Sequence, residues 1–446
     1  MAFLALAIFA ILVIVSYRLG GRDLLSPWFL LCLAIFGSYC ILMLNYKNWD
    51  VLIYGKFMLY ILTAIVSFGL GCLLVTKLCR KNVLNNDKER VALFSRNFKS
   101  KYPINIILFF SIVCAVLYIY KLISDAGSGG SFSDILRRIY SSSVDDGYSP
   151  GFIYNQMMEI VIAIAYISSY RLVLKMNSRN DKISFIKLII PIILFLIVAM
   201  VSTNRNMFLQ YAIYFICIFI IVYSEGYAKR DANKRILLKV IPMLAFIIII
   251  FFLLGKAKQY SSNMFKSVSI YAGSGLYSFN IWLENFDGPL TCGASTFTTF
   301  LGTLNTVLNP LGIHFDIKVD QIDEFIYFYS SNGYLYDSNI YTAMRAYVQD
   351  FGYFGVILFP FIIGMFYHWL FLKTKNSKDG FSRVIYCMLI YSVVFFPILE
   401  RLFRRWTLGL LYELFWITVL YYAIYNRRTK RAPKQIIVCK QGVKNE

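Results

Sequence analysis

The sequence predicts an all-α polytopic membrane protein with about eleven transmembrane helices, and three observations support this fold class. Hydrophobic residues make up 59% of the 446 residues and charged residues only 15%, whereas an average soluble domain is about 25% charged. The hydrophobic residues form runs close to the roughly 20 residues that a helix needs to cross a bilayer. The Lys and Arg residues lie between these runs, so the net charge of +21 does not indicate a nucleic-acid partner.

The apolar runs place the eleven expected spans in order along the chain. They lie at residues 2–17, 28–44, 57–76, 104–122, 151–170, 184–201, 206–223, 237–255, 352–372, 384–399 and 407–425. The first run has no basic residues before it and no clear cleavage site after it, so we expect a retained span. The chain then divides into a membrane domain of residues 1–255, a loop of residues 256–350, a second membrane domain of residues 351–425 and a basic tail of residues 426–446.

The Lys and Arg bias of the connections predicts the orientation. With the N-terminus outside, 31 of the 45 Lys and Arg residues fall on the inner side and 14 on the outer side. The outer 14 are also spread over a much longer stretch of chain. The positive-inside rule therefore predicts an N-terminus on the outer side and a cytoplasmic C-terminal tail beside anionic lipid.

The expected outer loop, 256–350, is unusually long and aromatic. Loops above about 15 residues are uncommon unless they are functional or disordered, and this aromatic content is too high for a solvated linker. Gly273-Ser274-Gly275 is interpreted as a turn, and the run from Phe297 to Leu308 as a short interfacial helix. We expect a small structured cap over the membrane domain.

Basic residues on the outer side are the first candidates for chemistry. Arg205 follows Ser202-Thr203-Asn204, whose side chains suit the N-cap of the next helix. A guanidinium at the positive end of a helix is unfavourable unless an anion shares the site, so Arg205 either contacts an anion or snorkels to the interface.

A second basic cluster fills the connection before the last span. Glu400-Arg401-Leu402-Phe403-Arg404-Arg405 places three arginines within five residues. The planar guanidinium fork matches phosphate oxygens, so several arginines near one point suit a diphosphate. The alternative is contact with lipid headgroups.

A third candidate segment leads into the ninth span. Arg345 and Gln349 are four residues apart and would share one helix face. Asp350 lies at the expected membrane boundary and could act as a carboxylate base, pair with Arg345 or cap the span. The residues alone do not choose among these three roles.

Two acids, Glu159 and Glu413, fall inside expected spans, where an ionisable residue is a functional-site hypothesis by default. His314 and His368 are the only histidines. Two histidines without spaced carboxylate or cysteine partners give no convergent ligand set, so we expect no metal and no cofactor.

The layout and short motifs resemble the Wzy-type O-antigen or oligosaccharide repeat-unit polymerases. The resemblance rests on the many spans, the Ser202 to Arg205 turn, the large outer loop and the stretch from Asn339 to Gly355, which looks like the family's Asn-x-Tyr-Thr…Arg…Asp-Phe-Gly-x-x-Gly entry into a span.

This resemblance implies a GT-C-like membrane glycosyltransferase of the bacterial inner membrane. It implies transfer of a growing glycan from undecaprenyl diphosphate to a lipid-linked repeat unit on the periplasmic face, without metal or nucleotide sugar, beside membrane lipids and a chain-length regulator. The residues expected to act in catalysis are Arg205, Arg345, Asp350, Arg401 and Arg404, with Glu159, Glu400 and Glu413 as alternative bases. Those expected to bind substrate are Arg405, Asn339, Tyr341, Trp282 and Glu400.

Two other functions compete with this one. An O-antigen ligase would use a periplasmic histidine, but Gly312-Ile313-His314-Phe315-Asp316 does not look like that family's motif. A lipid-linked oligosaccharide flippase would be expected to have twelve to fourteen spans and short loops, whereas this chain has one long outer loop.

Overall fold

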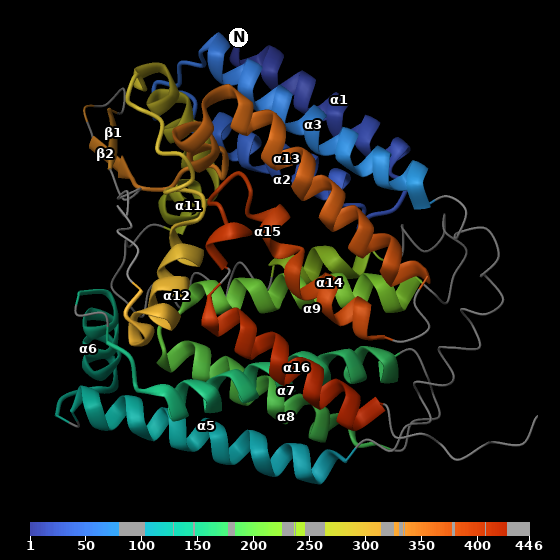
Figure 1. Cartoon of the computed structure of the whole chain (residues 1–446), viewed down its shortest axis with the longest axis vertical. Coiled ribbons are helices and arrows are strands. Elements are labelled where there is room, and N and C mark those ends of the chain that lie inside the picture. The colour runs from blue at the N-terminus through green and yellow to red at the C-terminus, as the bar shows by residue number, and fades with distance from the viewer. Residues whose placement is uncertain are drawn as a thin grey trace, which may run out of the picture.

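The computed structural model describes most of the chain. Its described residues are 1–79, 103–127, 129–145, 148–176, 183–224, 236, 238–245, 264–313, 325–329, 333, 335–376, 380–405 and 407–425. Within them the chain is mainly helical (Figure 1). Seven of the helices are long and apolar enough to cross a membrane. This confirms a polytopic helical chain, while the count of eleven spans stays a prediction.

Most of the expected spans coincide with one helix each. These helices are α1 (Ala2–Leu19), α2 (Pro27–Leu44), α3 (Gly55–Cys79), α5 (Ile104–Ala126), α7 (Phe152–Met176), α8 (Phe185–Val201), α9 (Arg205–Ser224), α13 (Met344–Asn376) and α16 (Leu408–Tyr425). The expected span 237–255 lies largely outside the described residues. The expected span 384–399 is not one helix, because the chain forms α14 (Phe381–Leu389), α15 (Tyr391–Val394) and then a turn.

The long connections form their own elements at one end of the bundle, here called the hairpin end. They are α6 (Phe132–Asp145), α11 (Met264–Asn285), α12 (Thr298–Leu308), the 3₁₀ turn η2 (Asn309–Leu311) and the strands β1 (Ile326–Tyr329) and β2 (Leu335–Ser338) (Figure 1). The strands pair antiparallel, with Ile326 opposite Ser338. This small hairpin departs from the expected all-α fold, whereas α12 confirms the helix expected near 297–308.

The interpretation of Gly273-Ser274-Gly275 as a turn is wrong, because all three residues lie inside α11. Both glycines permit close packing instead. A Cβ on Gly273 would lie 2.9 Å from the Ile41 side chain in α2, and a Cβ on Gly275 would lie 2.5 Å from the Pro397 carbonyl oxygen. Glycine is favoured both in turns and where two backbones approach closely, so the sequence alone does not separate these two roles.

Helix α11 is joined to the connection between α2 and α3. The Asn280 side chain donates to the Leu52 carbonyl at 2.8 Å and accepts from the Tyr54 amide at 3.0 Å. The Lys56 ammonium donates to the Leu283 carbonyl at 2.7 Å. This portion of the 256–350 stretch is therefore packed against the bundle itself, and it supplies Trp282 to the site described below.

Helix α6 was not expected from the sequence, although its Ile135, Leu136 and Ile139 have the spacing of one apolar helix face. Leu136 and Ile139 are buried. Arg138 holds the end of α5, since its Nε donates to the Ala126 carbonyl and its Nη2 to the Gly127 carbonyl, both at 2.8 Å. This satisfies carbonyl groups that a helix end leaves open.

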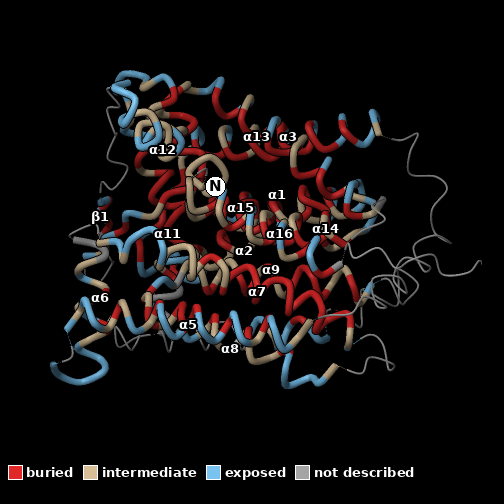
Figure 2. Tube along the Cα trace, turned by 60° about the horizontal axis from the view of Figure 1, so that its bottom comes forward, coloured by how far each residue is buried: buried red, intermediate tan, exposed pale blue. Residues whose placement is uncertain are grey.

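The buried residues concentrate in the middle of the bundle, and many outward residues are large and apolar (Figure 2). Phe109 of α5 and Phe3 of α1 are 63% and 69% exposed. A soluble surface rarely gathers such side chains, whereas a lipid-facing helix requires them. The outer surface of the bundle is thus suited to hydrocarbon.

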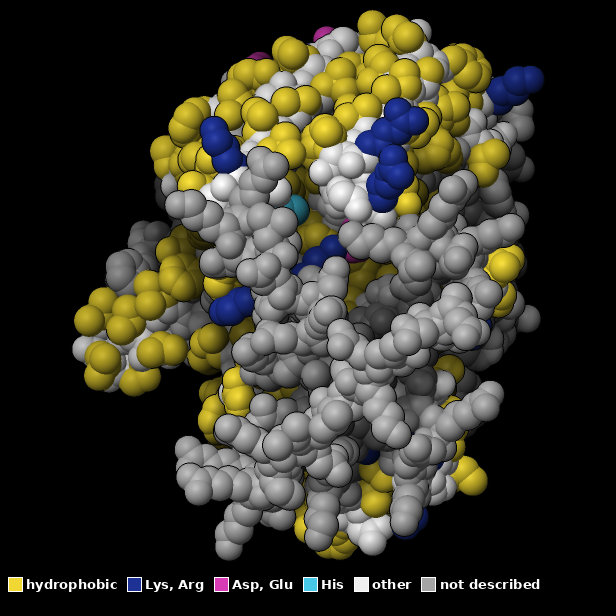
Figure 3. Space-filling model, turned by 90° about the vertical axis from the view of Figure 1, so that its right-hand side faces the viewer, with side chains coloured by type: hydrophobic (Ala, Val, Ile, Leu, Met, Phe, Trp, Pro, Cys, Tyr) yellow, Lys and Arg dark blue, Asp and Glu magenta, His cyan; other side chains and the backbone are white. Residues whose placement is uncertain are grey.

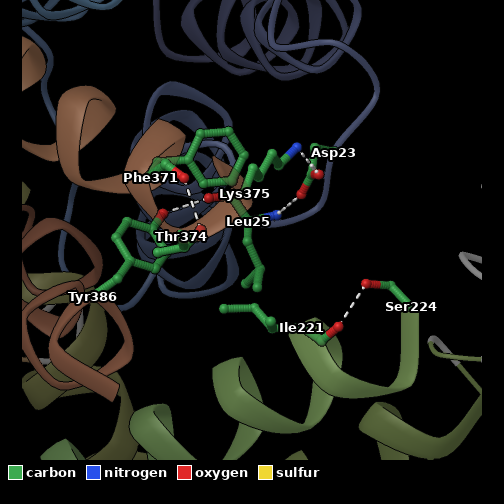
Figure 4. Close-up of polar contacts among 8 residues, drawn as sticks. All are labelled: Asp23, Leu25, Ile221, Ser224, Phe371, Thr374, Lys375 and Tyr386. Atoms are coloured by element: carbon green, nitrogen blue, oxygen red, sulfur yellow. Dashed lines mark hydrogen bonds and ion pairs between the residues drawn. The ribbon is translucent and has the colours of Figure 1, made fainter. Parts of the chain in front are cut away.

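The end of the bundle opposite the hairpin carries Lys and Arg side chains (Figure 3). There the Lys375 ammonium of α13 pairs with the Asp23 carboxylate at 2.5 Å, and the Tyr386 hydroxyl of α14 donates to the Leu25 carbonyl at 2.5 Å (Figure 4). These contacts join α13 and α14 to the connection between α1 and α2. They are structural ties, remote from the hairpin end.

Candidate functional site

The first eight residues of α13 form a short helix that the rest of the site is built around. Gly352 interrupts α13 with φ 58° and ψ −143°, so the segment 344–351 is separated by a kink from the long helix that follows. Non-glycine residues are excluded from this backbone region. Gly355 closes the kink, because a Cβ there would lie 2.2 Å from the Tyr347 carbonyl oxygen. The kink coincides with the start of the span expected at residue 352, and the position of the membrane boundary stays a prediction.

Replacing Gly352 with alanine is expected to destabilise the protein by about 1–3 kcal/mol, since alanine cannot adopt this backbone conformation without strain. Gly37→Ala is the matched control, because Gly37 lies inside α2 and an added Cβ would meet nothing within 4 Å. Thermal unfolding of the purified variants in one detergent measures the difference. Equal unfolding temperatures for the two variants would contradict the kink.

Arg345 is buried between two aromatic rings. Its guanidinium carbon lies 3.9 Å from the Tyr341 ring centroid and 5.1 Å from that of Trp282 in α11. Trp282 also stacks on Phe286 at 4.5 Å. Aromatic faces stabilise a guanidinium most strongly when it is desolvated. Arg345, Tyr341 and Trp282, all expected from the sequence, are therefore brought together, with Trp282 acting as a platform for the arginine.

Asp350 lies at the end of the short helix and is 1% exposed. Its carboxylate accepts the Ser295 amide at 3.0 Å, the Thr296 amide at 2.6 Å and the Thr291 hydroxyl. These contacts give Asp350 a role that was not considered from the sequence, in which its carboxylate holds the loop 291–296 that precedes α12. Proton abstraction by Asp350 stays a prediction.

The residues 401–405, here called the arginine turn, are shaped by Glu400. One carboxylate oxygen accepts the amides of Leu402 at 2.8 Å and Phe403 at 3.0 Å, and the other accepts the Arg404 amide at 2.8 Å. Burial raises the pKa of the Glu400 carboxyl, while these three amides act in the opposite direction. Glu400 is 3% exposed, and its carboxylate binds the backbone amides of the turn.

The three arginines of the turn have different surroundings. Arg405 pairs with Glu413 of α16 at 2.5 Å and lies 4.7 Å from the Tyr391 ring centroid. Arg401 has no hydrogen bond or ion pair from its guanidinium to any residue in the described ranges, and burial lowers its pKa. Arginine stays protonated in proteins. Arg401 is therefore a charge without a hydrogen-bonded or ion-paired partner among the described residues, whereas Arg405 links the turn to α16.

A small cavity of about 10 Å³, which is about the space that one water molecule needs, lies beside Arg401. Its lining comes from α13 and the residue before it, from α15 and the residues after it, and from the arginine turn: Ala343, Tyr347, Ile363, Tyr367, Ser392, Val393, Phe396, Glu400, Arg401 and Leu402. The Ala343 amide donates to the Phe396 carbonyl at 2.9 Å. The start of α13 and the approach to the arginine turn therefore run side by side along this cavity.

The remaining residues expected from the sequence lie in several places. Asn339 follows β2 and is exposed. Arg205 begins α9, where the Asn204 side chain accepts the Met207 amide at 3.2 Å, confirming the expected cap. The Arg205 side chain itself, Trp406 and His314 lie outside what the structure describes. Arg404 lies on the arginine turn, half-buried.

Two intramembrane acids lie beneath the turn. Gly409 of α16 brings the backbone close to Glu159, since a Cβ there would lie 3.6 Å from the Glu159 carboxylate. One turn further along α16, Glu413 holds Arg405. The second Glu159 oxygen is buried and accepts no hydrogen bond from the described residues. His368, by contrast, lies within the α3 and α13 contact, where its Nε2 is 2.7 Å from the Thr76 hydroxyl.

Comparison with known proteins gives one informative similarity. A stretch covering 44% of this chain is 24% identical over 203 residues to a protein named O-antigen polymerase from Shigella dysenteriae. The match covers 49% of that protein, so this chain is aligned with about half of its relative's length. No family model matches the chain, and no solved structure matches it. The chain is thus a helical membrane protein that is similar, over a portion of its length, to an O-antigen polymerase.

Proposed function

We propose that this protein polymerises oligosaccharide repeat units carried on undecaprenyl diphosphate, at the outer face of the bacterial inner membrane. The similarity to an O-antigen polymerase and the multi-span helical fold support this reaction class. The Lys and Arg bias of the connections supports a periplasmic position for the hairpin end, where the arginine turn lies.

The observation that carries the proposal is the arginine turn with Arg401 beside the cavity. In the proposed transfer, the bond from the anomeric carbon to the diphosphate breaks as the acceptor hydroxyl oxygen bonds to that carbon. The hydroxyl proton passes to a base, for which Asp350 is the expected residue. Negative charge grows on the leaving diphosphate. A pre-positioned guanidinium stabilises such charge and can bind phosphate oxygens through two parallel hydrogen bonds.

Three of the four acids near the turn have structural partners, which supports charge stabilisation as the main contribution of the protein. Asp350 and Glu400 accept several hydrogen bonds each, and Glu413 is paired with Arg405. Arg345 and Arg205 would add positive charge near the same substrate. No metal and no nucleotide sugar enter this proposed reaction, and a chain-length regulator is the expected partner.

The surface polysaccharide profile of a strain lacking the gene tests the function. A polymerase predicts loss of the ladder of long chains, with a single repeat unit still attached to the lipid A core. Loss of every attached unit would point to a ligase or a flippase and would contradict the proposal. Restoration of the ladder by the gene on a plasmid excludes an effect on neighbouring genes.

A further inference from the structure

We propose that Tyr347 is a positioning residue, which fixes the arginine turn through Glu400 and thereby sets how Arg401 faces a diphosphate. This inference rests on the proposed function, because it concerns the binding of the same leaving group. Tyr347 was not singled out by the sequence, although it lies two residues after Arg345.

The contact between Tyr347 and Glu400 is direct and buried. The Tyr347 hydroxyl donates to the Glu400 carboxylate at 3.2 Å, on the oxygen that also accepts the Leu402 and Phe403 amides. The Tyr347 ring stacks on Phe359 with centroids 4.9 Å apart. The ring is 0% exposed, so packing fixes its direction and the hydroxyl holds the carboxylate in place.

The hydroxyl is the one side-chain donor that Glu400 receives among the described residues, since its other hydrogen bonds come from the turn's own backbone. Without it, Glu400 would be oriented only by the segment that it is meant to organise. A hydrogen bond to a buried charged group contributes more than a neutral one. Tyr347 thus joins the turn to α13, a helix whose position does not depend on the turn.

A second route leads from the same short helix to the same turn. Asp350 holds the amides of Ser295 and Thr296, and the next ring, Phe297, lies 5.2 Å from that of Phe403 in the turn. The Tyr347 and Phe403 rings also meet edge to face at 6.3 Å. The helix 344–351 therefore holds the arginine turn from two sides, and Tyr347 is its polar contact.

A double-mutant cycle tests this role in the purified full-length chain, with inorganic pyrophosphate as the probe. Tyr347→Phe, which removes only the hydroxyl, is expected to weaken pyrophosphate binding by about tenfold, the scale of one hydrogen bond to a charged group. Glu400→Gln should also weaken it. If both act through their shared contact, the double variant should lose clearly less than the product of the two single losses.

Tyr386→Phe is the matched control. Its hydroxyl is equally buried and also donates to an oxygen, the Leu25 carbonyl, but at the opposite end of the bundle (Figure 4). It should lower the unfolding temperature to a similar extent and leave pyrophosphate affinity within about twofold of wild type.

Wild-type affinity in Tyr347→Phe, or losses that multiply in the double variant, would overturn the positioning role. A stability loss without an affinity loss would overturn it too. If the wild-type chain itself binds no pyrophosphate, the anion site and this inference both fail, whereas the proposed function is decided separately by the polysaccharide ladder.

Discussion

Replacing Arg401 with alanine is expected to reduce polymer formation by at least about 100-fold, the usual effect of removing one group that stabilises developing charge. Arg401 lines the cavity, and no described residue engages its guanidinium by a hydrogen bond or ion pair. Arg401→Lys should recover only a fraction of the activity, because an ammonium keeps the charge but cannot form the planar two-point contact.

Arg137→Ala provides the control for charge alone. Arg137 is an exposed arginine on α6, on the same expected side of the membrane and away from the arginine turn. The variants are compared by the ladder of surface polysaccharide at matched protein levels in the membrane. A normal ladder with Arg401→Ala, or equal losses with Arg401→Ala and Arg137→Ala, would remove Arg401 from the reaction.

Replacing Glu413 with glutamine is expected to destabilise the protein by about 3–5 kcal/mol, the usual cost of leaving one charge of a buried ion pair uncompensated. The partner left behind is Arg405, whose side chain is 12% exposed and which pairs with Glu413 at 2.5 Å. The arginine turn would lose its link to α16, so polymer formation should fall as well.

Glu159→Gln is the matched comparison, because Glu159 lies beside the same groups and one of its carboxylate oxygens accepts no hydrogen bond among the described residues. Glutamine has nearly the shape of this carboxyl group and breaks no hydrogen bond at that oxygen, so stability should hold. Thermal unfolding in detergent separates the two variants. An equal loss from both substitutions would show that Glu159 also anchors the turn.

The spans were largely predictable because the bilayer imposes a simple rule, a continuous apolar run of fixed length. That rule fails where a helix is interrupted within an apolar stretch. The run 384–399 is apolar almost throughout, yet it forms α14, α15 and a turn. Hydropathy predicts that a segment is buried in lipid or protein, but it does not predict where the backbone bends.

The components of the site were more predictable than their arrangement. Arg345 and the arginine turn were predicted as candidates because basic residues are scarce on the expected outer side of the membrane. The packing of Arg345 against Trp282 joins residues more than 60 positions apart, which spacing cannot show. The role of Glu400 is local, since it accepts amides two to four residues ahead, and a carboxylate before a tight turn is a readable capping signal.

Reconstitution tests the central claim most directly. The purified chain would be placed in liposomes with undecaprenyl-diphosphate-linked repeat units, a chelator and no nucleotide sugar. The proposed function predicts glycans of two or more repeat units on the lipid carrier, with release of undecaprenyl diphosphate, and much less product from Arg401→Ala. Single repeat units left unchanged by a folded wild-type chain would contradict polymerisation by this protein.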